Sequence, residues 1–252
     1  MQINPTPTLY NLGGKGYHLE LLNKFCPVPE FFVISLVEDK SIDEQVILSS
    51  FDELGAEKVS VRSSATCEDG ENASFAGMFE SVLNVERDNL IDAVNQVIAS
   101  GTGERVAEYC KLKGITEKPQ MRVVVQKMVK SRISGVCITT ENEILIEACH
   151  GLGEGLVSGS VTPDAYYISR DTFEIKDMHI SCQKKMLINH EYERVPFHMA
   201  NAKKMKDDEI LELSKIALNI EKQIGFKSAD IEWAYEGEKL YILQAREFVG
   251  YE

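Results

Sequence analysis

The spacing of hydrophobic and polar positions changes along the chain and divides its N-terminal part into helical and extended segments. Apolar residues recur at helical spacing in residues 16–25, 89–100 and 103–113, which predicts three helices. Short runs rich in β-branched and aromatic residues, VPEFFVIS and VSVRS, predict strands between the first two of these helices. Helices and strands are thus mixed without a regular β-α-β alternation, which favours α+β organisation over a doubly wound sheet.

The pattern becomes mostly extended from residue 121 onward. The runs MRVVVQKMV, ISGVCITT, EILIEAC and DAYYIS are short and separated by turns, as in a meandering, mostly antiparallel sheet. The segment DDEILELSKIALNIEKQIG predicts one long helix that ends at Gly225. Its apolar stripe consists of Ile210, Leu213, Ala217, Ile220 and Ile224. We therefore expect an N-terminal lobe over residues 1–115 and a C-terminal lobe over residues 116–252.

Composition and charge narrow the classes of protein that fit this pattern. The chain has 252 residues, 44% of them hydrophobic, and a net charge of −13. An acidic chain without a Lys/Arg cluster is a poor candidate for binding nucleic acid or an anionic membrane. The six cysteines form no C-x-x-C motif, and no apolar stretch reaches the roughly 18–20 residues of a membrane span. With no signal-peptide pattern at the N-terminus, these features predict a cytoplasmic protein with reduced thiols.

The last segment, ADIEWAYEGEKLYILQAR, predicts a hairpin whose turn centres on Gly237. That turn places Glu232 opposite Ile242, with Gln244 one diagonal step away and Arg246 two residues further on the same face. The other face would carry Ile231, Trp233, Tyr241 and Leu243. A carboxylate and an amide oxygen suit Mg²⁺, and an arginine suits phosphate. The alternative is an ordinary solvated face.

Two glycine-containing segments are candidates for phosphate binding. NLGGKG, residues 11–16, offers a close backbone approach and the positive charge of Lys15, although it is not a Walker motif. VSVRSSATCEDGENASFAGMFESVLNV, residues 59–85, is a long polar connection with Arg62 near its start and Gly77 and Ser81 near its end. A helix-capping turn and a mobile surface loop are the respective alternatives. HGLGEGLVSG lacks the third glycine of a dinucleotide fingerprint, so a dinucleotide fold is not supported.

Taken in order, these motifs resemble the ATP-binding domain of the phosphoenolpyruvate synthase and pyruvate phosphate dikinase family. The same domain occurs in rifampicin phosphotransferase and glutamine kinase. The collinear motifs are GGKG, VPEFFVIS, VRSS, VVVQKMV, SGVCIT, IEACHGLGEGLVSGSVTPDAY and DIEWAYEGEKLYILQAR, and they extend over nearly the whole chain. The resemblance implies an ATP-grasp fold, in which two α+β lobes close on a nucleotide. Only residues 35–58 stand where the family usually has a long helical insertion, so we expect a compact version.

The resemblance also implies a role for individual residues. Lys15 and Arg62 would hold the phosphates of ATP, and Gly77 and Ser81 would belong to the phosphate loop. Gln126, Lys127, Met128 and Val129 would border the adenine mainly through backbone groups, and Glu147 would face the nucleotide or its ribose. Glu232 and Gln244 would ligate Mg²⁺, and Arg246 would stabilise the charge of the transferring phosphoryl group.

By the same resemblance, the chain would bind Mg-ATP and pass the β-phosphoryl group to a histidine on a separate swivelling domain, with AMP and phosphate as products. The Thr-x-His motif of that domain and an acceptor-substrate domain are absent from this sequence, so both would lie on a longer protein or a separate chain. His150 is interpreted as a packing residue. Two alternatives stay open: a nucleotide-binding regulatory module without turnover, and an ADP-forming ATP-grasp ligase. The sequence does not identify the phosphoryl acceptor.

Overall fold

A computed structural model describes residues 1–35, 42–66, 69–70, 73–74, 79–101, 103–112 and 120–248 of the protein. It divides into two compact units. The N-terminal unit comprises Met1–Glu20 and Pro29–Met128, and the C-terminal unit comprises Leu21–Val28 and Val129–Glu252. The division therefore differs from the predicted boundary after residue 115. Strand β7 (Met121–Lys127) accounts for the difference, because it pairs with two strands of the N-terminal sheet.

The N-terminal unit is built on a five-stranded sheet with the order β1-β2-β7-β3-β6. Its other strands are β1 (Gln2–Ile3), β2 (Phe31–Ser35), β3 (Val59–Ala65) and β6 (Ser81–Val85), and a separate two-stranded pair is formed by β4 (Asp69–Gly70) and β5 (Ala73–Ser74). Its helices are α1 (Leu9–Leu22, which continues into the C-terminal unit), α2 (Glu44–Leu54), η1 (Arg87–Asn89), α3 (Leu90–Ser100) and α4 (Glu104–Leu112). All pairs in the five-stranded sheet are antiparallel.

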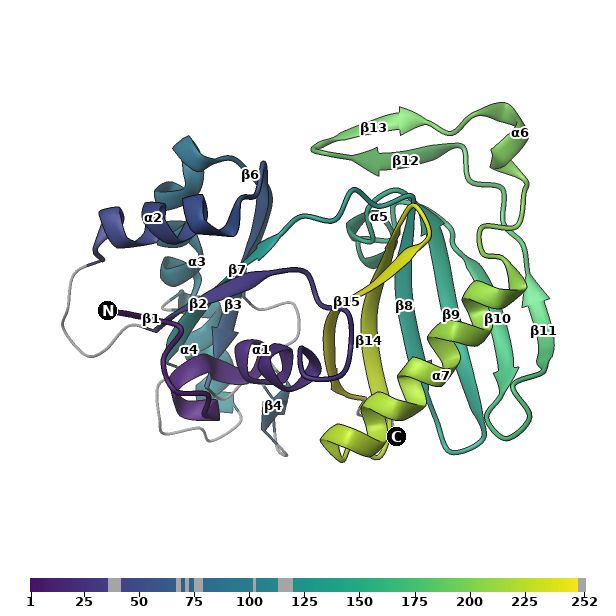
Figure 1. The fold of residues 1–252 in the computed structure, drawn as a ribbon, viewed down its shortest axis with the longest axis horizontal. Helices are drawn as coiled ribbons and strands as arrows, with labels where there is room; N and C mark the ends of the chain where they lie inside the picture. The colour runs from purple at the N-terminus through teal and green to yellow at the C-terminus, as the bar shows by residue number, and fades with distance from the viewer. Residues whose placement is uncertain are drawn as a thin grey trace. The chain divides into compact units, whose positions relative to one another are not determined.

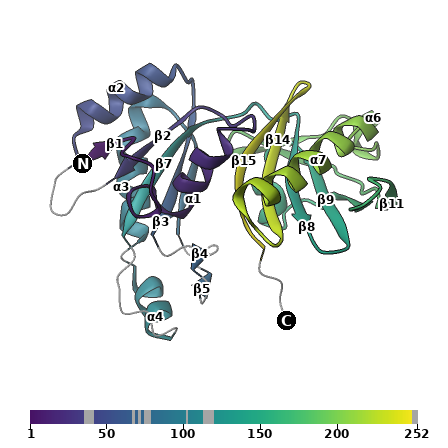
Figure 2. The ribbon, with the colours of Figure 1, turned by 60° about the horizontal axis from the view of Figure 1, so that its bottom comes forward.

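The two faces of this sheet are covered by different helices (Figure 2). On one face, valines of β3 and β7 pack with Ile47 and Phe51 of α2 and with Val94 and Val97 of α3 in one buried cluster. On the other face, Gly16 of α1 lies against β2 and β7, where an added Cβ would be 3.3 Å from the Val33 side chain. A helix can approach a sheet this closely only where a small residue faces the strands.

Helix α1 differs from its prediction. It begins at Leu9 instead of residue 16 and is interrupted at Gly13, whose φ of 70° and ψ of 176° are not helical. The first turn forms because the backbone N–H groups of Asn11 and Leu12 both donate to the Thr8 carbonyl. The prediction began the helix at residue 16 because glycines have a low helix propensity.

The C-terminal unit is built on a six-stranded antiparallel sheet with the order β11-β10-β9-β8-β14-β15. These strands are β8 (Ile133–Thr139), β9 (Glu143–His150), β10 (Asp164–Ser169), β11 (Ile175–His179), β14 (Ala229–Glu236) and β15 (Lys239–Glu247). A second hairpin, β12 (Lys185–Ile188) and β13 (Glu191–Arg194), and the short helices α5 (Glu154–Val157) and α6 (Phe197–Ala200) complete the unit with α7 (Asp207–Ile224). The predicted antiparallel meander is confirmed for three of its four runs, which form β8, β9 and β10, whereas MRVVVQKMV supplies β7 of the N-terminal sheet.

Helix α7 lies against β8 and β14 on one face of this sheet (Figure 1). Its predicted stripe is confirmed: Ile210, Leu213, Ala217 and Ile220 are buried, and Gly225 ends the helix in the left-handed conformation. The sheet contributes Ile231, Trp233 and Tyr235 of β14 to the same core, all with no exposed surface. Helix α7 therefore covers one face of the sheet, and the opposite face is the one on which the predicted metal ligands lie.

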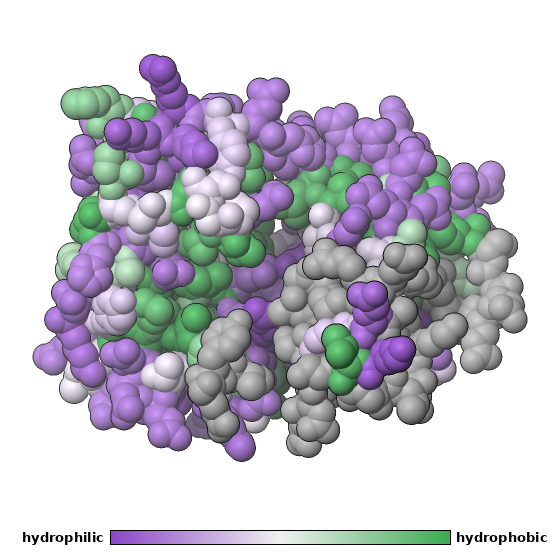
Figure 3. Space-filling view, turned by 180° about the vertical axis from the view of Figure 1, so that it is seen from behind, coloured by the Kyte–Doolittle hydropathy of each residue, from purple (hydrophilic) through white to green (hydrophobic). Residues whose placement is uncertain are grey.

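Seen from behind, the surface carries many hydrophilic residues with hydrophobic ones between them (Figure 3). Within the described part of the chain, no helix is long and apolar enough to cross a membrane.

Candidate functional site

The hairpin of β14 and β15 contains a β-bulge that the sequence analysis did not predict. Trp233 pairs with Ile242, whereas the preceding residue Glu232 pairs with Gln244, so that Leu243 is an extra residue in β15. A bulge changes the phase of a strand by one residue. The predicted pairing of Glu232 with Ile242 is wrong by two residues. One comes from the turn, because Glu236 pairs with Lys239 and the turn is therefore not centred on Gly237, and one comes from the bulge. Glu232 lies directly opposite Gln244.

The bulge also corrects the assignment of faces in β15. Leu240 and Ile242 are buried opposite Tyr235 and Trp233, on the face that α7 covers. Tyr241 pairs with Ala234 and so lies on the Glu232 face, not on the opposite face as predicted. The reason is that β15 changes phase at Leu243, which a regular alternation cannot show.

Four residues on neighbouring strands form one row across the face of the sheet opposite α7. Glu147 of β9 pairs with Val136 of β8, Val136 pairs with Glu232 of β14, and Glu232 pairs with Gln244 of β15. Directly paired residues point to the same face, with Cβ atoms about 4.5–5.5 Å apart. Three predicted site residues from separate parts of the sequence, Glu147, Glu232 and Gln244, are thus brought into one line.

Arg246 lies in the adjacent row, opposite Asp230. Its guanidinium donates two hydrogen bonds to the same carboxylate oxygen, from Nε to Asp230 Oδ2 at 2.9 Å and from Nη2 to Asp230 Oδ2 at 2.6 Å. The Asp230 side chain is 16% exposed and that of Arg246 is 38% exposed. The ion pair fixes the orientation of the Arg246 head group on the same face as Glu232 and Gln244.

The donor set of this face fits a magnesium ion. Glu232 offers a carboxylate and the buried Gln244 an amide oxygen, and Mg²⁺ in nucleotide sites usually takes one or two such protein ligands together with phosphate oxygens and water. Among the described residues, no group of three or more His, Cys, Asp or Glu side chains could hold a metal by itself. Burial raises the pKa of Glu147 above its ordinary value of 4.5, which fits a carboxylate that faces a ligand from a partly desolvated position.

In the N-terminal unit, the GGKG segment is fastened to strand β3 by Ser64. The Ser64 hydroxyl donates to the Leu12 carbonyl at 2.7 Å and accepts from the Gly16 backbone N–H at 3.0 Å. At Gly13 an added Cβ would stand 2.1 Å from the Ser64 carbonyl oxygen, so only glycine fits there. Lys15 is thereby carried on a turn pressed against the strand that contains Arg62.

Arg62, Ser81 and Gln126 share the face of the sheet on which α1 packs. Arg62 pairs with Ser81 of β6, and Ser60, two residues before Arg62, pairs with Gln126 of β7. Gln126 is 2% exposed, and its Nε2 has no hydrogen-bond partner among the described residues. A buried, unpaired amide donor costs free energy, and an acceptor on a ligand would satisfy it.

The other residues predicted to border the adenine, Lys127, Met128 and Val129, do not share the surroundings of Gln126. Lys127, at the end of the strand, forms an ion pair with Glu30 at 3.4 Å and alternates away from the Gln126 face. The backbone N–H groups of Lys127 and Met128 already donate to the carbonyls of Glu30 and Lys58. Val129 is buried and begins the second stretch of the C-terminal unit. The predicted phosphate-loop residue Gly77 lies outside the described residues.

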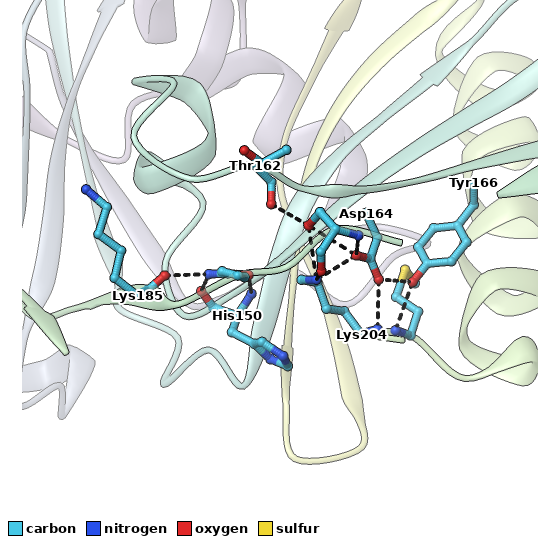
Figure 4. Close-up of polar contacts among 9 residues, drawn as sticks. His150, Thr162, Asp164, Tyr166, Lys185 and Lys204 are labelled. Carbon is cyan, nitrogen blue, oxygen red and sulfur yellow. Dashed lines mark hydrogen bonds and ion pairs between the residues drawn. The ribbon is translucent and has the colours of Figure 1, made fainter. Parts of the chain in front are cut away.

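His150, at the end of β9, is a packing residue, as predicted. It is buried, and the Gln183 carboxamide binds both its backbone N–H and its carbonyl, at 2.8 and 3.0 Å. Its ring lies near the buried ion pair of Lys204 and Asp164, and by geometry neither ring nitrogen has a hydrogen-bond partner among the described residues (Figure 4). Burial, followed by the charge of Lys204, lowers the pKa of His150, which keeps the ring neutral at pH 7.

Comparison with known proteins gives the family. The family model described as "Pyruvate phosphate dikinase, AMP/ATP-binding domain" matches residues 39–249. The chain belongs to this family. Membership confirms the α+β ATP-grasp fold that the sequence motifs imply.

Relatives of this pyruvate phosphate dikinase family are longer than the chain. A probable phosphoenolpyruvate synthase of Methanocaldococcus jannaschii is 38% identical over 98% of the chain, which covers 21% of that protein. The uncharacterised phosphotransferase YvkC of Bacillus subtilis is 32% identical over 93% of the chain, which covers 33% of that protein. Among solved structures, PH1788 from Pyrococcus horikoshii aligns with 96% of the chain and 93% of its own length, at a TM-score of 0.51 and 14% identity.

The structure adds two supporting residues that the sequence analysis missed. Asp230 orients Arg246, and Arg122 of β7 binds the backbone that precedes Gly13. Both gave a signal in the sequence: a charged residue directly beside an apolar run, in DIEW and in MRVVV. A charge in a strand that is otherwise buried needs a specific partner, and its position is a reason to look for one.

Proposed function

We propose that the chain is the ATP-binding part of a dikinase-type phosphotransferase. It binds Mg-ATP and passes the β-phosphoryl group to a histidine outside the chain, with AMP and phosphate as products. The observation that carries this proposal is the row of Glu147, Glu232 and Gln244 with Arg246 beside it. Family membership supports the nucleotide, and the greater length of the relatives supports a histidine domain and an acceptor domain elsewhere.

In this proposal, each side chain has a role that follows from its charge. Lys15 and Arg62 hold phosphate oxygens, Arg62 with the planar fork that suits bidentate binding. Glu232 and Gln244 hold Mg²⁺, which when bound would neutralise charge on the phosphates. Arg246, held by Asp230, presents its guanidinium to the charge that develops on the transferring phosphoryl group. The chain thus positions the phosphates of ATP and stabilises the charge on the transferring phosphoryl group, while the nucleophile is the external histidine.

The first experiment is calorimetric titration of the chain with ATP in the presence of Mg²⁺. Glu232→Ala should weaken binding at least about tenfold, because it removes a charged metal ligand. Glu236→Ala is the matched control, since Glu236 is on the same strand at its exposed end and should stay within about twofold of the wild type. Equal affinity in wild type and Glu232→Ala would contradict the metal-nucleotide assignment.

The nucleotide product separates this proposal from the other two functions. Chromatography of ATP incubated with the chain and a histidine-containing partner domain should show AMP. ADP as the product would identify an ATP-grasp ligase instead. Tight Mg-ATP binding without any turnover, with every partner tried, would identify a regulatory nucleotide-binding module.

A further inference from the structure

Arg122 is an arginine enclosed in the N-terminal sheet. It occupies the second position of β7, between β2 and β3, and only 3% of its surface is exposed. Arginine keeps its charge when buried, so its five N–H donors must all be accommodated. The role of Arg122 therefore depends on which oxygen atoms accept hydrogen bonds from its guanidinium.

The guanidinium of Arg122 is bound by neutral oxygens. Nε donates to the Asn11 carbonyl at 3.2 Å, and Nη2 donates to the Tyr10 carbonyl at 3.1 Å. Nη2 also donates to Gln120 Oε1 at 2.9 Å, and Nη1 donates to the Met121 carbonyl at 3.1 Å. The head group lies 5.6 Å from the centre of the Tyr10 ring. Among the described residues, no carboxylate shares this charge.

Arg122 acts together with Ser64, its direct partner across β3 and β7. Arg122 binds the carbonyls of Tyr10 and Asn11, and Ser64 binds the carbonyl of Leu12. Three consecutive peptide groups are therefore held by one cross-strand pair. They immediately precede Gly13, the residue at which α1 leaves helical geometry.

We propose that Arg122 is a positioning residue for Lys15 in the binding of phosphate-bearing ligands. By holding the backbone before Gly13, it fixes the turn that carries Lys15 and presents the ammonium group from one orientation. This inference rests on the proposed function, because it assigns to Lys15 the phosphates of the bound nucleotide.

The charge of Arg122 contributes to the same task. Arg62 and Ser64 are alternate residues of β3, so the row of Arg122 lies about 7 Å from that of Arg62 on the same face. Burial lowers the pKa of Arg122, but an arginine stays protonated at pH 7. An enclosed cation without a carboxylate partner raises the local potential, which favours an anionic ligand beside Lys15 and Arg62.

Lysine would not replace arginine at this position. An ammonium group is a point charge at the end of a flexible chain, whereas the guanidinium spans two successive carbonyls with a rigid fork. Arg122→Lys therefore keeps the positive charge but loses the simultaneous hydrogen bonds to two carbonyls. Arg122→Met keeps most of the side-chain volume but loses both the charge and these hydrogen bonds.

The test measures the affinity of the full chain for ATP with Mg²⁺ and for adenosine, which lacks phosphate. Arg122→Met should weaken ATP about tenfold and leave adenosine within about twofold, because only the phosphate contacts depend on Lys15. Gln120→Ala is the matched control: it removes an acceptor of the same guanidinium without touching the turn, and should leave both affinities near the wild type. Equal losses for ATP and adenosine in Arg122→Met would overturn the inference.

A double-mutant cycle with Lys15→Met separates positioning from general damage. If Arg122 acts through Lys15, Arg122→Met should have little further effect on ATP affinity once Lys15 is replaced. Fully additive losses would overturn the inference. If Arg122→Met does not fold, the same cycle is made with Arg122→Lys, for which we expect a loss of about threefold that disappears in the Lys15→Met background.

The outcomes also distinguish this inference from the proposed function. Mg-ATP binding that depends on Lys15 and Glu232 but not on Arg122 would leave the function standing and reject the role of Arg122. Absence of ATP binding by the wild-type chain would reject both.

Discussion

Asp230 and Arg246 show how a single contact fixes the orientation of a candidate site residue. The Arg246 guanidinium would otherwise sample many rotamers from the edge strand of the sheet. Two hydrogen bonds to Asp230 Oδ2 remove that freedom. The positioning of Arg246 is thus a property of the pair, although the resemblance assigned a role to the arginine alone.

Replacing Asp230 by Asn should lower the free energy of unfolding by about 1–2 kcal/mol. The loss is smaller than for a fully enclosed pair, because the Arg246 side chain is 38% exposed. Urea denaturation monitored by circular dichroism measures the change. Asp177→Asn, on the exposed strand β11, is the control and should stay within about 0.5 kcal/mol of the wild type. An equal effect in both variants would show that the ion pair does not stabilise the hairpin.

The buried His150 should make stability depend on pH. Its pKa is lowered in the folded chain, so the unfolded chain binds more protons in the window from about pH 6.5 downward to the folded pKa. Stability should therefore fall as the pH is lowered through this window, by at most about 1.4 kcal/mol per pH unit from this one group. His150→Gln should remove that part of the dependence.

The measurement is the difference in unfolding free energy between His150→Gln and wild type at several pH values from 7 to 4.5. The exposed His198 provides the control, since His198→Gln should leave the wild-type pH profile unchanged. Parallel profiles for wild type and His150→Gln would contradict the prediction. The charges that act on its ring are those of Lys204, Asp164 and Arg132.

At the scale of elements, helix α7 shows what a sequence pattern can and cannot predict. The helix and its apolar stripe followed from spacing, because 3.6-residue periodicity is a local property. The ion pairs formed by two of its carboxylates, Glu209 near the start and Glu221 near the end, could not be predicted from spacing. Glu209 binds Arg132, 77 residues away, and Glu221 binds Arg170, 51 residues away. Such pairs depend on the arrangement of the sheet, which the periodicity of one helix does not contain.

Replacing Glu221 by Gln should destabilise the C-terminal unit by about 2–3 kcal/mol, because it leaves Arg170 with a neutral partner at a mostly buried position. Glu221 accepts from both Nη1 and Nη2 of Arg170, and the Arg170 side chain is only 28% exposed. Chemical denaturation gives the value, and Lys222→Gln at the next, exposed position is the control. A loss below about 0.5 kcal/mol would mean that solvent satisfies Arg170 equally well.

In the candidate site, too, some features could be predicted from the sequence and others could not. The resemblance of motifs was enough to select Glu147, Glu232, Gln244 and Arg246, and the sheet brings them to one face. The predicted pairing partner of Glu232 was wrong for two reasons. The turn consists of two residues, Gly237 and Glu238, instead of being centred on Gly237, and β15 contains a bulge, which is set by the backbone of two strands together and leaves no mark in their composition. Arg122 and Asp230 were missed because their roles depend on contacts across strands and with α1.

At the scale of the whole molecule, the chain does not divide at one point. Leu21–Val28 belongs to the C-terminal unit although it precedes most of the N-terminal unit in sequence. The Pro27 carbonyl accepts a hydrogen bond from the Ile242 backbone N–H of the edge strand β15, and Leu22 is fully buried. The short segment therefore covers an edge that would otherwise be open to pairing with another chain.

A fragment that begins at Val129 should consequently associate more than the full chain. We expect light scattering and size-exclusion chromatography to show oligomers of this fragment at concentrations where the full chain gives a single species. A synthetic peptide of residues 19–30 added in excess should reduce the association, and a scrambled peptide of the same composition should not. A fragment that stays monodisperse without the peptide would show that β15 needs no cover.

The bulge at Leu243 has a consequence for how this domain tolerates insertions and deletions. Loss of Ala245 would exchange inward and outward positions in the rest of β15 and place Arg246 opposite Ile231, toward α7. Loss of Leu243 itself would instead leave a regular ladder in which Glu232 still pairs with the glutamine and Trp233 with Ile242. Leu243 is therefore a position where a change of length is compatible with the candidate site, and a shortened hairpin that lacks it should keep the order of the candidate site residues and the buried position of Ile242.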